Sequence, residues 1–220
     1  MAAIAIVGGH GKISRHLIPL LVEAGHTPVA LIRDPRQADD LTPLGARTRL
    51  LDIENAETDD FAEAFEGCAA VVFAAGGGPD GNIERKRSVD LGGSLKSIEA
   101  AQKIGIDRFL QVSAIGIDED PPEDSGDVWK AYVQAKRDAD AALRASSLRW
   151  TIIRPGALTD DEPTARVLLA PEVERGEIPR ADVAAVLAAV LDDNRTSGRQ
   201  WELVGGPGSI HEAVTAALSS

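Results

Sequence analysis

Cysteine is almost absent from this chain, and so are the features of a membrane or secreted protein. The single cysteine, Cys68, cannot form an intramolecular disulfide, and together with only four histidines it cannot build a cysteine-rich zinc site. We therefore expect no metal centre. The first residues lack the charged and apolar regions of a signal peptide, and no run approaches the roughly 18 apolar residues of a membrane span. The sequence thus favours a reducing, cytoplasmic compartment, and we expect no contact with a membrane.

Basic and aromatic residues are scarce as well. Lys and Arg number 23 against 35 Asp and Glu, which gives a formal net charge of −12. A strongly acidic chain repels phosphate backbones and anionic lipid surfaces, so nucleic acid is not an expected partner. Aromatic residues make up only 4% of the chain, so Ala, Val, Leu and Ile must build the core. The length of 220 residues suits a single domain over residues 1–220.

Short apolar runs alternate with longer amphipathic stretches along almost the whole chain. The unbroken apolar run 3–7 is typical of a buried strand, and residues 12–24 carry a helical period that ends at Gly25. Further strands are predicted over 29–32, 47–51, 69–75, 108–112, 150–153 and 200–204, and further helices over 59–65, 84–104, 129–145, 181–191 and 210–218. This alternation predicts an α/β fold, a doubly wound parallel sheet flanked by helices. Ligands of such sheets bind at the carboxyl ends of the strands.

A glycine-rich turn follows the first predicted strand. Its residues are Gly8, Gly9, His10, Gly11, Lys12, Ile13 and Ser14. Glycine lets the backbone turn sharply and lets a pyrophosphate approach the amides at the start of a helix, and a small residue such as Ser14 suits the position where helix and strand pack closely. Because the turn lies between a first strand and a first helix, it predicts a dinucleotide-binding site, although a purely structural turn uses glycine too.

The second predicted strand ends in Arg33. An acidic residue at this place binds the ribose 2′-hydroxyl of NAD, whereas a guanidinium suits the 2′-phosphate of NADP. Arg33, assisted by Arg36, therefore favours NADP, with NAD as the alternative. In that alternative Asp34 binds the ribose, and the two arginines are solvated loop residues.

The third and fourth predicted strands also end in residues that suit a dinucleotide. Asp52 offers an acceptor for the adenine amino group, and Ile53 offers an apolar side chain that can pack on the ring. Ala74, Ala75 and Gly76 are small enough for the cofactor to cross the strand tip. Each of these residues has an alternative role in a helix cap or a turn.

The only tyrosine of the chain stands four residues before a lysine. On a helix Tyr132 and Lys136 share one face, and Ser113 follows the fifth predicted strand. A carbonyl that accepts hydride develops negative charge on its oxygen, which Tyr132 could protonate and Ser113 could hydrogen-bond. Lys136 would favour the phenolate by its charge and could bind the nicotinamide ribose. The alternative is a packing tyrosine, a solvated lysine and a strand-end serine.

Together these motifs resemble the short-chain dehydrogenase/reductase superfamily over nearly the whole chain. The resemblance extends to its atypical NAD(P)-binding branch, related to NmrA-like proteins and to biliverdin and flavin reductases and often described as NAD-dependent epimerase/dehydratase. It rests on residues 8–14, 52–53, 74–76, 112–114, Tyr132 with Lys136, residues 154–156 and residues 178–184. The resemblance implies a Rossmann fold in which Ser113, Tyr132 and Lys136 correspond to the catalytic triad.

The same resemblance implies that Pro155, Gly156 and Leu158 lie near the nicotinamide. Residues 154–180 then form a small C-terminal part of the substrate side. The superfamily often has an asparagine on the helix after the fourth strand, where this chain has Asp90, and an acid there would alter the proton relay. Many members of the branch lack the tyrosine, and some are regulators that sense the cofactor ratio.

Several functions are compatible with these patterns. The first is an NADP(H)-dependent oxidoreductase that transfers hydride to a small carbonyl or quinone-like acceptor. The second is a non-catalytic NADP-binding redox sensor that acts through a protein partner. A third, direct hydride transfer to a flavin or quinone, needs no protonating tyrosine. The acidic loop 118–127 is either a solvated surface loop or a lid that would discourage anionic substrates. The sequence leaves both a monomer and a homodimer open.

Overall fold

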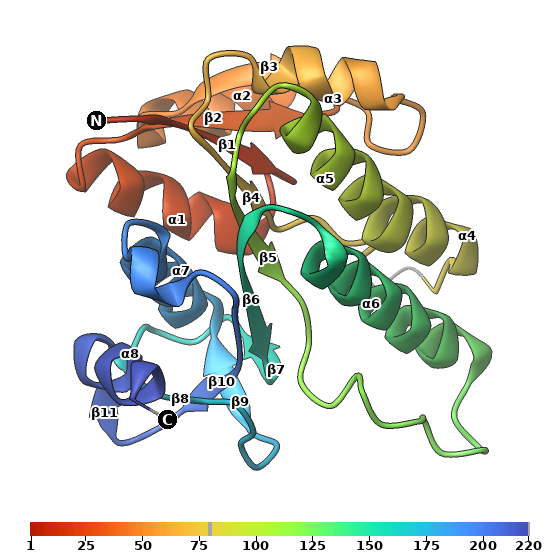
Figure 1. Cartoon of the computed structure of the whole chain (residues 1–220), viewed down its shortest axis with the longest axis vertical. Helices are drawn as coiled ribbons and strands as arrows, with labels where there is room; N and C mark the ends of the chain where they lie inside the picture. The colour runs from red at the N-terminus through yellow and green to blue at the C-terminus, as the bar shows by residue number, and fades with distance from the viewer. Residues whose placement is uncertain (79–80, 220) are drawn as a thin grey trace.

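The computed structural model describes residues 1–78 and 81–219, and its middle layer is a nine-stranded sheet (Figure 1). Along the chain its strands are β1 (Ala3–Val7), β2 (Thr27–Ile32), β3 (Arg47–Leu50), β4 (Ala70–Phe73), β5 (Arg108–Val112), β6 (Arg149–Pro155), β8 (Arg166–Ala170), β10 (Arg199–Gly205) and β11 (Gly208–Ser209). In space the order is β11-β8-β10-β6-β5-β4-β1-β2-β3. Neighbouring strands from β3 to β10 run parallel, which confirms the predicted doubly wound parallel sheet.

The strand order reverses between β1 and β4. Strands β2 and β3 extend the sheet on one side of this point, and β5 and β6 extend it beyond β4 on the other. Such a switch point leaves a crevice at the carboxyl ends of the strands, where ligands of open α/β sheets bind. The glycine-rich turn follows β1 directly, so the fold places this turn at the crevice.

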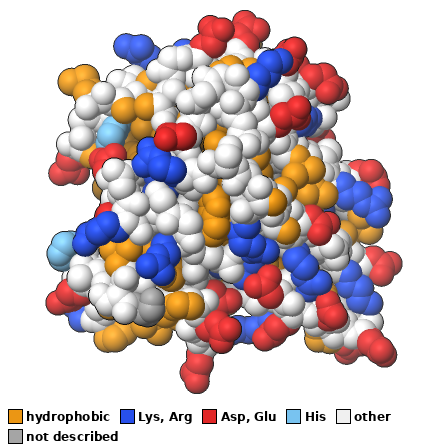
Figure 2. All heavy atoms as spheres, viewed as in Figure 1, with side chains coloured by type: hydrophobic (Ala, Val, Ile, Leu, Met, Phe, Trp, Pro, Cys, Tyr) orange, Lys and Arg blue, Asp and Glu red, His pale blue; other side chains and the backbone are white. Residues whose placement is uncertain are grey.

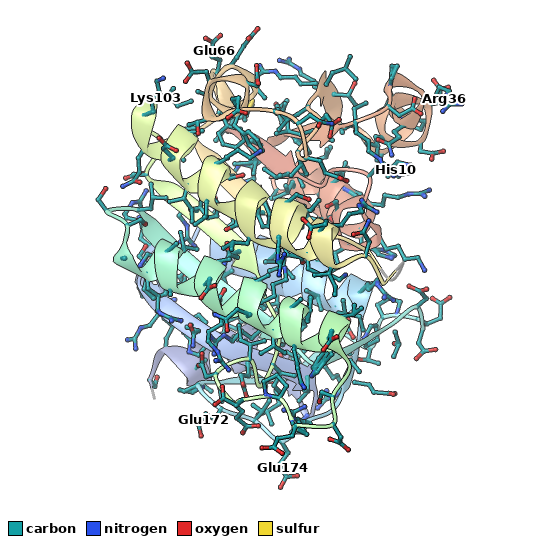
Figure 3. The ribbon with its side chains drawn as sticks, turned by 90° about the vertical axis from the view of Figure 1, so that its right-hand side faces the viewer. His10, Arg36, Glu66, Lys103, Glu172 and Glu174 are labelled. Atoms are coloured by element: carbon teal, nitrogen blue, oxygen red, sulfur yellow. The ribbon has the colours of Figure 1, made fainter. Side chains whose placement is uncertain are left out.

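Helices cover both faces of the sheet (Figure 1). One layer contains α1 (Lys12–Glu23), α7 (Arg180–Leu191) and α8 (Ile210–Leu218), and the other contains α3 (Thr58–Phe65), α5 (Ser94–Lys103) and α6 (Asp127–Ala145). Figure 3 shows α5 and α6 side by side across the second face. In the part of the chain that the structure describes, no helix is long and apolar enough to cross a membrane.

The alternation of side chains along β1 shows why two cores form. Ile4 and Ile6 belong to the core beneath α1, α7 and α8, whereas Ala5 and Val7 belong to the core beneath α3, α5 and α6. Strands that are buried on both faces are expected in a parallel sheet, and they require the unbroken apolar runs seen in the sequence. Most of both cores is aliphatic, as the scarcity of aromatic residues predicted.

The predicted helix 84–104 is present, but its winding changes along its length. It begins as α4 (Ile83–Arg85), widens into the π-helical segment η3 (Lys86–Gly93) and continues as α5. Gly93 lies where the helix meets the end of β3, because a Cβ there would be 2.5 Å from Cγ2 of Ile53. π-Helical turns occur frequently at functional sites.

Beyond β6, the predicted strand 200–204 is present as the parallel strand β10, but the sequence prediction missed the antiparallel strands and a separate small pair. β8 runs antiparallel to β10, and β11 runs antiparallel to β8. β7 (Ala157–Thr159) and β9 (Glu177–Pro179) form a separate parallel pair. β8 alternates exposed and buried residues although residues 167–170 form an unbroken apolar run, and it was not among the predicted strands. The short helical turns η1 (Pro35–Gln37), α2 (Ala38–Leu41) and η2 (Thr42–Leu44) after β2 were missed as well.

A buried arginine joins the end of α7 to the strands. Arg108 of β5 is 4% exposed and donates five hydrogen bonds of 2.6 to 3.0 Å. Burial lowers the pKa of Arg108 to about 10, so the guanidinium stays charged at neutral pH. Its acceptors are the carbonyls of Arg149, Val190 and Leu191 and the hydroxyls of Thr151 and Thr196.

Replacing Arg108 by Met is expected to destabilise the fold by about 3 to 5 kcal/mol, because several buried acceptors lose their donor. Urea unfolding followed by circular dichroism measures this free energy. The matched control is Arg149→Met in β6. Arg149 Nε binds Asp107 at the surface, 2.8 Å away, and loss of such a pair costs about 1 kcal/mol or less. Equal losses in the two variants would contradict the role given to Arg108.

Candidate cofactor and substrate site

A cavity of about 320 Å³ opens at the switch point of the sheet. Three residues that were predicted to bind the cofactor, Gly9, Lys12 and Ile13, do not line this cavity. Lys12 instead forms an ion pair with Asp160. Nine predicted cofactor residues do line the cavity, namely Gly8, His10, Gly11, Arg33, Asp52, Ile53, Ala74, Ala75 and Gly76. The carboxyl ends of β1, β2, β3 and β4 therefore meet in one cavity.

Close packing explains two of the glycines in the turn after β1. Gly8 has a φ of +81°, and a Cβ there would lie 2.8 Å from Cα of Ala75. A Cβ on Gly9 would lie 2.6 Å from that of Ala30 in β2. The turn therefore packs closely against β2 and the segment after β4. Ser14 Oγ donates a hydrogen bond to the Gly8 carbonyl at 2.9 Å. No side chain caps the first amides of α1, which suits an anion at this helix start.

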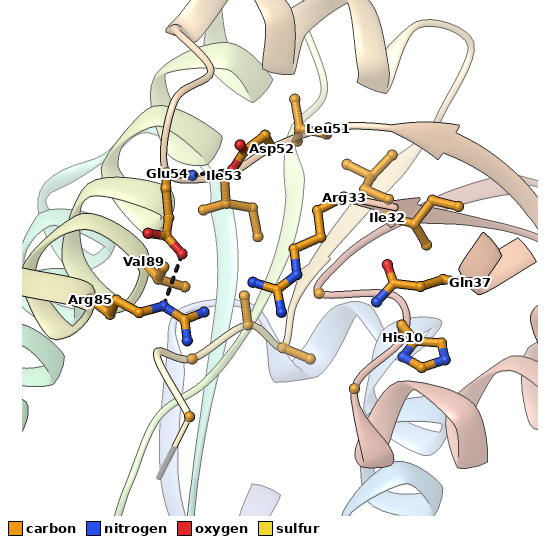
Figure 4. Close-up of a pocket in the computed structure, with 17 residues that line it drawn as sticks. His10, Ile32, Arg33, Gln37, Leu51, Asp52, Ile53, Glu54, Arg85 and Val89 are labelled. Atoms are coloured by element: carbon orange, nitrogen blue, oxygen red, sulfur yellow. Dashed lines mark hydrogen bonds and ion pairs between the residues drawn. The ribbon is translucent and has the colours of Figure 1, made fainter. Parts of the chain in front are cut away.

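Arg33 reaches into this cavity, whereas its charged neighbours do not (Figure 4). Arg36 Nε lies 3.0 Å from both carboxylate oxygens of Asp34. This hydrogen bonding lowers the pKa of Asp34 to about 2. Figure 3 shows Arg36, which was expected to assist Arg33, at the outer edge of the molecule. Arg33 is therefore the basic group of this loop that faces the cavity.

The opposite wall contains an ion pair that the sequence analysis missed. Arg85 Nε binds Glu54 Oε1 at 2.9 Å, and both residues line the cavity (Figure 4). Beside them, the carboxylate of Asp52 accepts the amide of Glu54 at 3.1 Å and Nδ2 of Asn55 at 2.7 Å. The bond from Asn55 lowers the pKa of Asp52, so this carboxylate is ionised at neutral pH. Asp52 thus shapes the turn after β3 as well as the cavity wall.

A second cavity of about 620 Å³ adjoins the first, because Gly78 lines both. Three residues predicted for the site, Tyr132, Gly156 and Leu158, line it, whereas Pro155 does not. Its volume is within the range of small-molecule sites. The lining also contains Lys86, Trp129 and Arg180.

Tyr132 lines the second cavity from α6. Its ring stacks on Trp129 with centroids 5.4 Å apart, and Nζ of Lys86 lies 5.6 Å from the ring centroid. Burial raises the pKa of Tyr132, and the charge of Lys136 offsets this only in part because neighbouring carboxylates act in the opposite sense. The charge of Lys136 favours the phenolate, as expected, but burial and the neighbouring carboxylates outweigh it, so the pKa of Tyr132 is raised. The phenol therefore stays protonated at neutral pH.

Lys136 is buried one helical turn after Tyr132. Its Nζ donates to the carbonyl of Val112 at 3.2 Å and lies 3.3 Å from Oδ1 of Asp90. Burial by itself would lower the pKa of Lys136, but the Asp90 carboxylate reverses the shift and raises it. The other oxygen of Asp90 accepts the amide of Gly77 at 2.8 Å. The acid at the usual asparagine position thus links the glycine-rich segment after β4 to the lysine of α6.

Ser113 is buried and lies outside the lining of both cavities. Its Oγ donates to Asp140 at 2.9 Å, and the same carboxylate accepts Gln111 Nε2 at 2.7 Å and Arg154 Nε at 2.9 Å. Burial raises the pKa of Asp140 despite these donors. The structure therefore brings all three predicted catalytic residues to neighbouring places on β5 and α6, but it directs the serine hydroxyl toward Asp140.

The acidic loop 118–127 is held by arginines. Gly126 is the residue of this loop that lines the second cavity, within the described part of the chain. The ion pairs favour the surface-loop alternative over an acidic lid. They join Asp118 to Arg154 at 2.6 Å, Glu119 to Arg175 at 3.2 Å and Asp120 to Arg137 at 3.0 Å.

Known proteins share this arrangement along nearly the whole chain. Residues 8–194 match a protein family described as NAD(P)H-binding. The chain is 37% identical over 210 residues to the uncharacterized sugar epimerase YhfK of Bacillus subtilis, which amounts to 95% of this chain and 97% of that protein. A solved structure from Bacillus halodurans, provisionally described as an NAD-dependent epimerase/dehydratase, has a TM-score of 0.91 at 36% identity over 98% of this chain and 100% of its own. The oxidoreductase ylbE of Lactococcus lactis has a TM-score of 0.86 at 27% identity, over 99% and 97%.

Because Tyr132 is the only tyrosine, its ionisation can be followed by the ultraviolet absorbance of tyrosinate. We expect a midpoint above the ordinary pKa of about 10, because burial disfavours the phenolate, and a return to about 10 in concentrated urea. Asp90→Asn is expected to lower the midpoint, since the carboxylate of Asp90 opposes ionisation of the phenol.

Asp138→Asn on the same helix is the control, because Asp138 bonds to Gln134 at 2.8 Å and should not affect the phenol. Circular dichroism at each pH verifies that the chain is folded. A midpoint below 10 in the folded protein would show that the charge of Lys136 outweighs burial.

Proposed function

Because this chain belongs to the NAD(P)H-binding family, as its resemblance to the atypical short-chain dehydrogenases/reductases predicted, we propose that it is an NADPH-dependent oxidoreductase. Its acceptor is a small carbonyl or quinone-like compound. One observation carries this proposal: the switch-point cavity with the glycine turn and Arg33 adjoins the cavity that contains the phenol of Tyr132. A dinucleotide in the first cavity and an acceptor in the second would meet where Gly78 lines both.

Arg33 supports NADPH rather than NADH as the cofactor. Its guanidinium enters the first cavity from the end of β2, where a 2′-phosphate lies in folds of this type. Asp34, the residue that would bind the ribose of NAD in the alternative, is outside the lining and hydrogen-bonded to Arg36. NAD stays the weaker candidate for this reason.

Tyr132 is the proposed proton donor. When bound, the nicotinamide supplies the hydride for the acceptor carbon. Tyr132 gives its phenolic proton to the acceptor oxygen, so that a carbonyl becomes an alcohol. Its raised pKa keeps this proton in place at neutral pH. Lys136, held by Asp90 and the Val112 carbonyl, places a positive charge near the phenolate that remains and is the residue to bind the nicotinamide ribose.

Two of the similar proteins are described as epimerases, but the site of this chain supports a reductase better than an epimerase. An epimerase of this type first removes a proton and a hydride from an alcohol, so its tyrosine must act as a base. The raised pKa of Tyr132 favours the protonated phenol, which suits an acid. The substrate side formed by residues 154–180 is also short, although it supplies Gly156, Ala157, Leu158 and Arg180 to the second cavity.

Ser113 favours a second candidate function, the NADP-binding redox sensor. Its hydroxyl donates to Asp140 and does not line the second cavity, as expected if the triad residues are structural. A sensor would bind NADPH, change its affinity for a protein partner and show no turnover with any acceptor. The two candidates share the first cavity and differ in the role of Tyr132.

Arg33→Ala is expected to weaken NADPH binding by about ten- to hundredfold, because charge-assisted hydrogen bonds to the 2′-phosphate are lost. NADH binding should change by no more than about twofold, since NADH lacks this phosphate. Nicotinamide fluorescence measures both affinities. Arg36→Ala is the matched control, because Arg36 pairs with Asp34 outside the cavity. Equal effects of the two substitutions on NADPH would remove Arg33 as the phosphate ligand.

Tyr132→Phe is expected to lower kcat for carbonyl reduction by about a hundredfold to ten-thousandfold, because the proton donor is lost while the ring still stacks on Trp129. NADPH affinity should be unchanged. Absorbance of NADPH during turnover gives the rate. Unchanged turnover would favour direct hydride transfer to a flavin or quinone, and absence of turnover in the unsubstituted protein would favour the sensor.

A further inference from the structure

The second cavity has a charge opposite to that of the chain. Within the described residues its ionisable lining consists of Lys86, Tyr132 and Arg180, and no carboxylate is among them. The chain as a whole has a net charge of −12, and the face in Figure 2 mixes acidic with basic side chains. Among the residues that the structure describes, the charged lining of this cavity is therefore positive, in contrast to the chain as a whole.

Lys86 supplies the first positive charge. It is 7% exposed, lies at the start of the π-helical segment η3 and donates to the carbonyl of Gly78. Its second neighbour is the ring of Tyr132, and no carboxylate in residues 1–78 and 81–219 forms an ion pair with it. A buried ammonium group is costly without a counter-charge, so the position of Lys86 favours an anionic ligand.

Arg180, the first residue of α7, supplies the second positive charge. Its Nη1 donates to Oδ1 of Asp160 at 2.6 Å. Lys12 binds the other oxygen of the same carboxylate, so Asp160 is shared between two cations. Arg180 is the one of these two cations that lines the cavity, and it has to share its counter-charge with Lys12.

Aromatic and apolar side chains form another part of the wall. Trp129 is 45% exposed and stacks on Tyr132 with an angle of 29° between the rings. Val128 and Leu158 add aliphatic surface to the same cavity. An accessible indole on an apolar wall is a good contact surface for a flat ring. The proposed proton donor stands next to this indole, so a bound ring would lie near the reacting phenol.

We propose that the acceptor reduced here is a flat aromatic carbonyl compound that carries an anionic group, such as a carboxylate, sulfonate or phosphate. Its ring packs on Trp129, and its anionic group binds Lys86 and Arg180. This inference rests on the proposed function, because it takes the second cavity as the acceptor site. An acidic lid would predict the opposite preference, but three carboxylates of loop 118–127, those of Asp118, Glu119 and Asp120, pair with arginines.

Three aryl ketones of similar shape test the inference: 4-acetylbenzoate is anionic, 4-acetylbenzamide is neutral and (4-acetylphenyl)trimethylammonium is cationic. Calorimetric titration of the full chain with NADP⁺ bound measures their affinities without turnover. We expect the carboxylate to bind about ten- to hundredfold more tightly than the amide, as for one or two charge-assisted hydrogen bonds, and the cation to bind most weakly. The cationic substituent activates the ketone most strongly toward hydride, so a preference for the carboxylate would come from binding.

Lys86→Met removes the charge and keeps the length of the side chain. It should lower the affinity for 4-acetylbenzoate about tenfold and leave that for the amide within about twofold, and Lys86→Arg should restore the preference. Arg180→Gln provides the same test if Lys86→Met lowers the Tm. Lys130→Met is the matched control, because Lys130 donates to the Glu123 carbonyl outside the lining.

Equal affinity for the carboxylate and the amide, or a preference that survives both Lys86→Met and Arg180→Gln, overturns the inference. NADPH oxidation with the three ketones separates it from the proposed function. NADPH oxidation with both ketones, together with equal affinities for the carboxylate and the amide, keeps the oxidoreductase and removes the anion site. A carboxylate preference in binding without NADPH oxidation keeps the anion site and removes the oxidoreductase.

Discussion

A carboxylate without access to solvent fixes the side of this molecule that carries Tyr132 and Lys136. Asp140 is 0% exposed, and a buried charge is tolerated only where donors replace its lost hydration. Gln111 of β5, Ser113 directly after β5 and Arg154 of β6 supply these donors, each within 2.9 Å. A shift of α6 along the sheet would break all three hydrogen bonds and leave the charge uncompensated. The helix therefore has one register against the sheet, and the serine is part of what sets it.

The same register positions the phenol and the ammonium group. Tyr132, Lys136 and Asp140 follow one another at intervals of about one helical turn, so fixing the last of them fixes the other two. A second tie runs through Asp90, which contacts Lys136 with one oxygen and the amide of Gly77 with the other. The π-helical segment that carries Asp90 is thereby bound to both the glycine-rich segment after β4 and the helix α6. The wall of the cofactor cavity and the proposed proton donor thus belong to one network.

Features encoded by short-range spacing could be predicted from the sequence, and features that depend on distant contacts could not. The glycine-rich turn and the pair of Tyr132 and Lys136 each lie within a single local element, so their relative positions follow from helix and turn geometry. The pair of Arg85 and Glu54 joins residues 31 positions apart. The strand β8 contains the short apolar run 167–170, but its antiparallel direction is set by its pairing with β10 and β11, which the run itself does not reveal. The orientation of Ser113 and the net pKa of Tyr132 depend on buried neighbours, which only the packed structure determines.

The placement of positive charge connects the two cavities. Arg33 and Arg85 line the first and Lys86 and Arg180 line the second, in a chain where acidic residues outnumber basic ones. A negative net charge disfavours the approach of any anion, including NADPH, but at physiological salt such repulsion is screened beyond about 8 Å. The acidic surface therefore repels an anion, and the basic cavity residues attract it, only over short distances. If the two cavities bind the proposed ligands, the choice among anionic ligands depends on the few guanidinium and ammonium groups that line them, because screening weakens the effect of more distant charges.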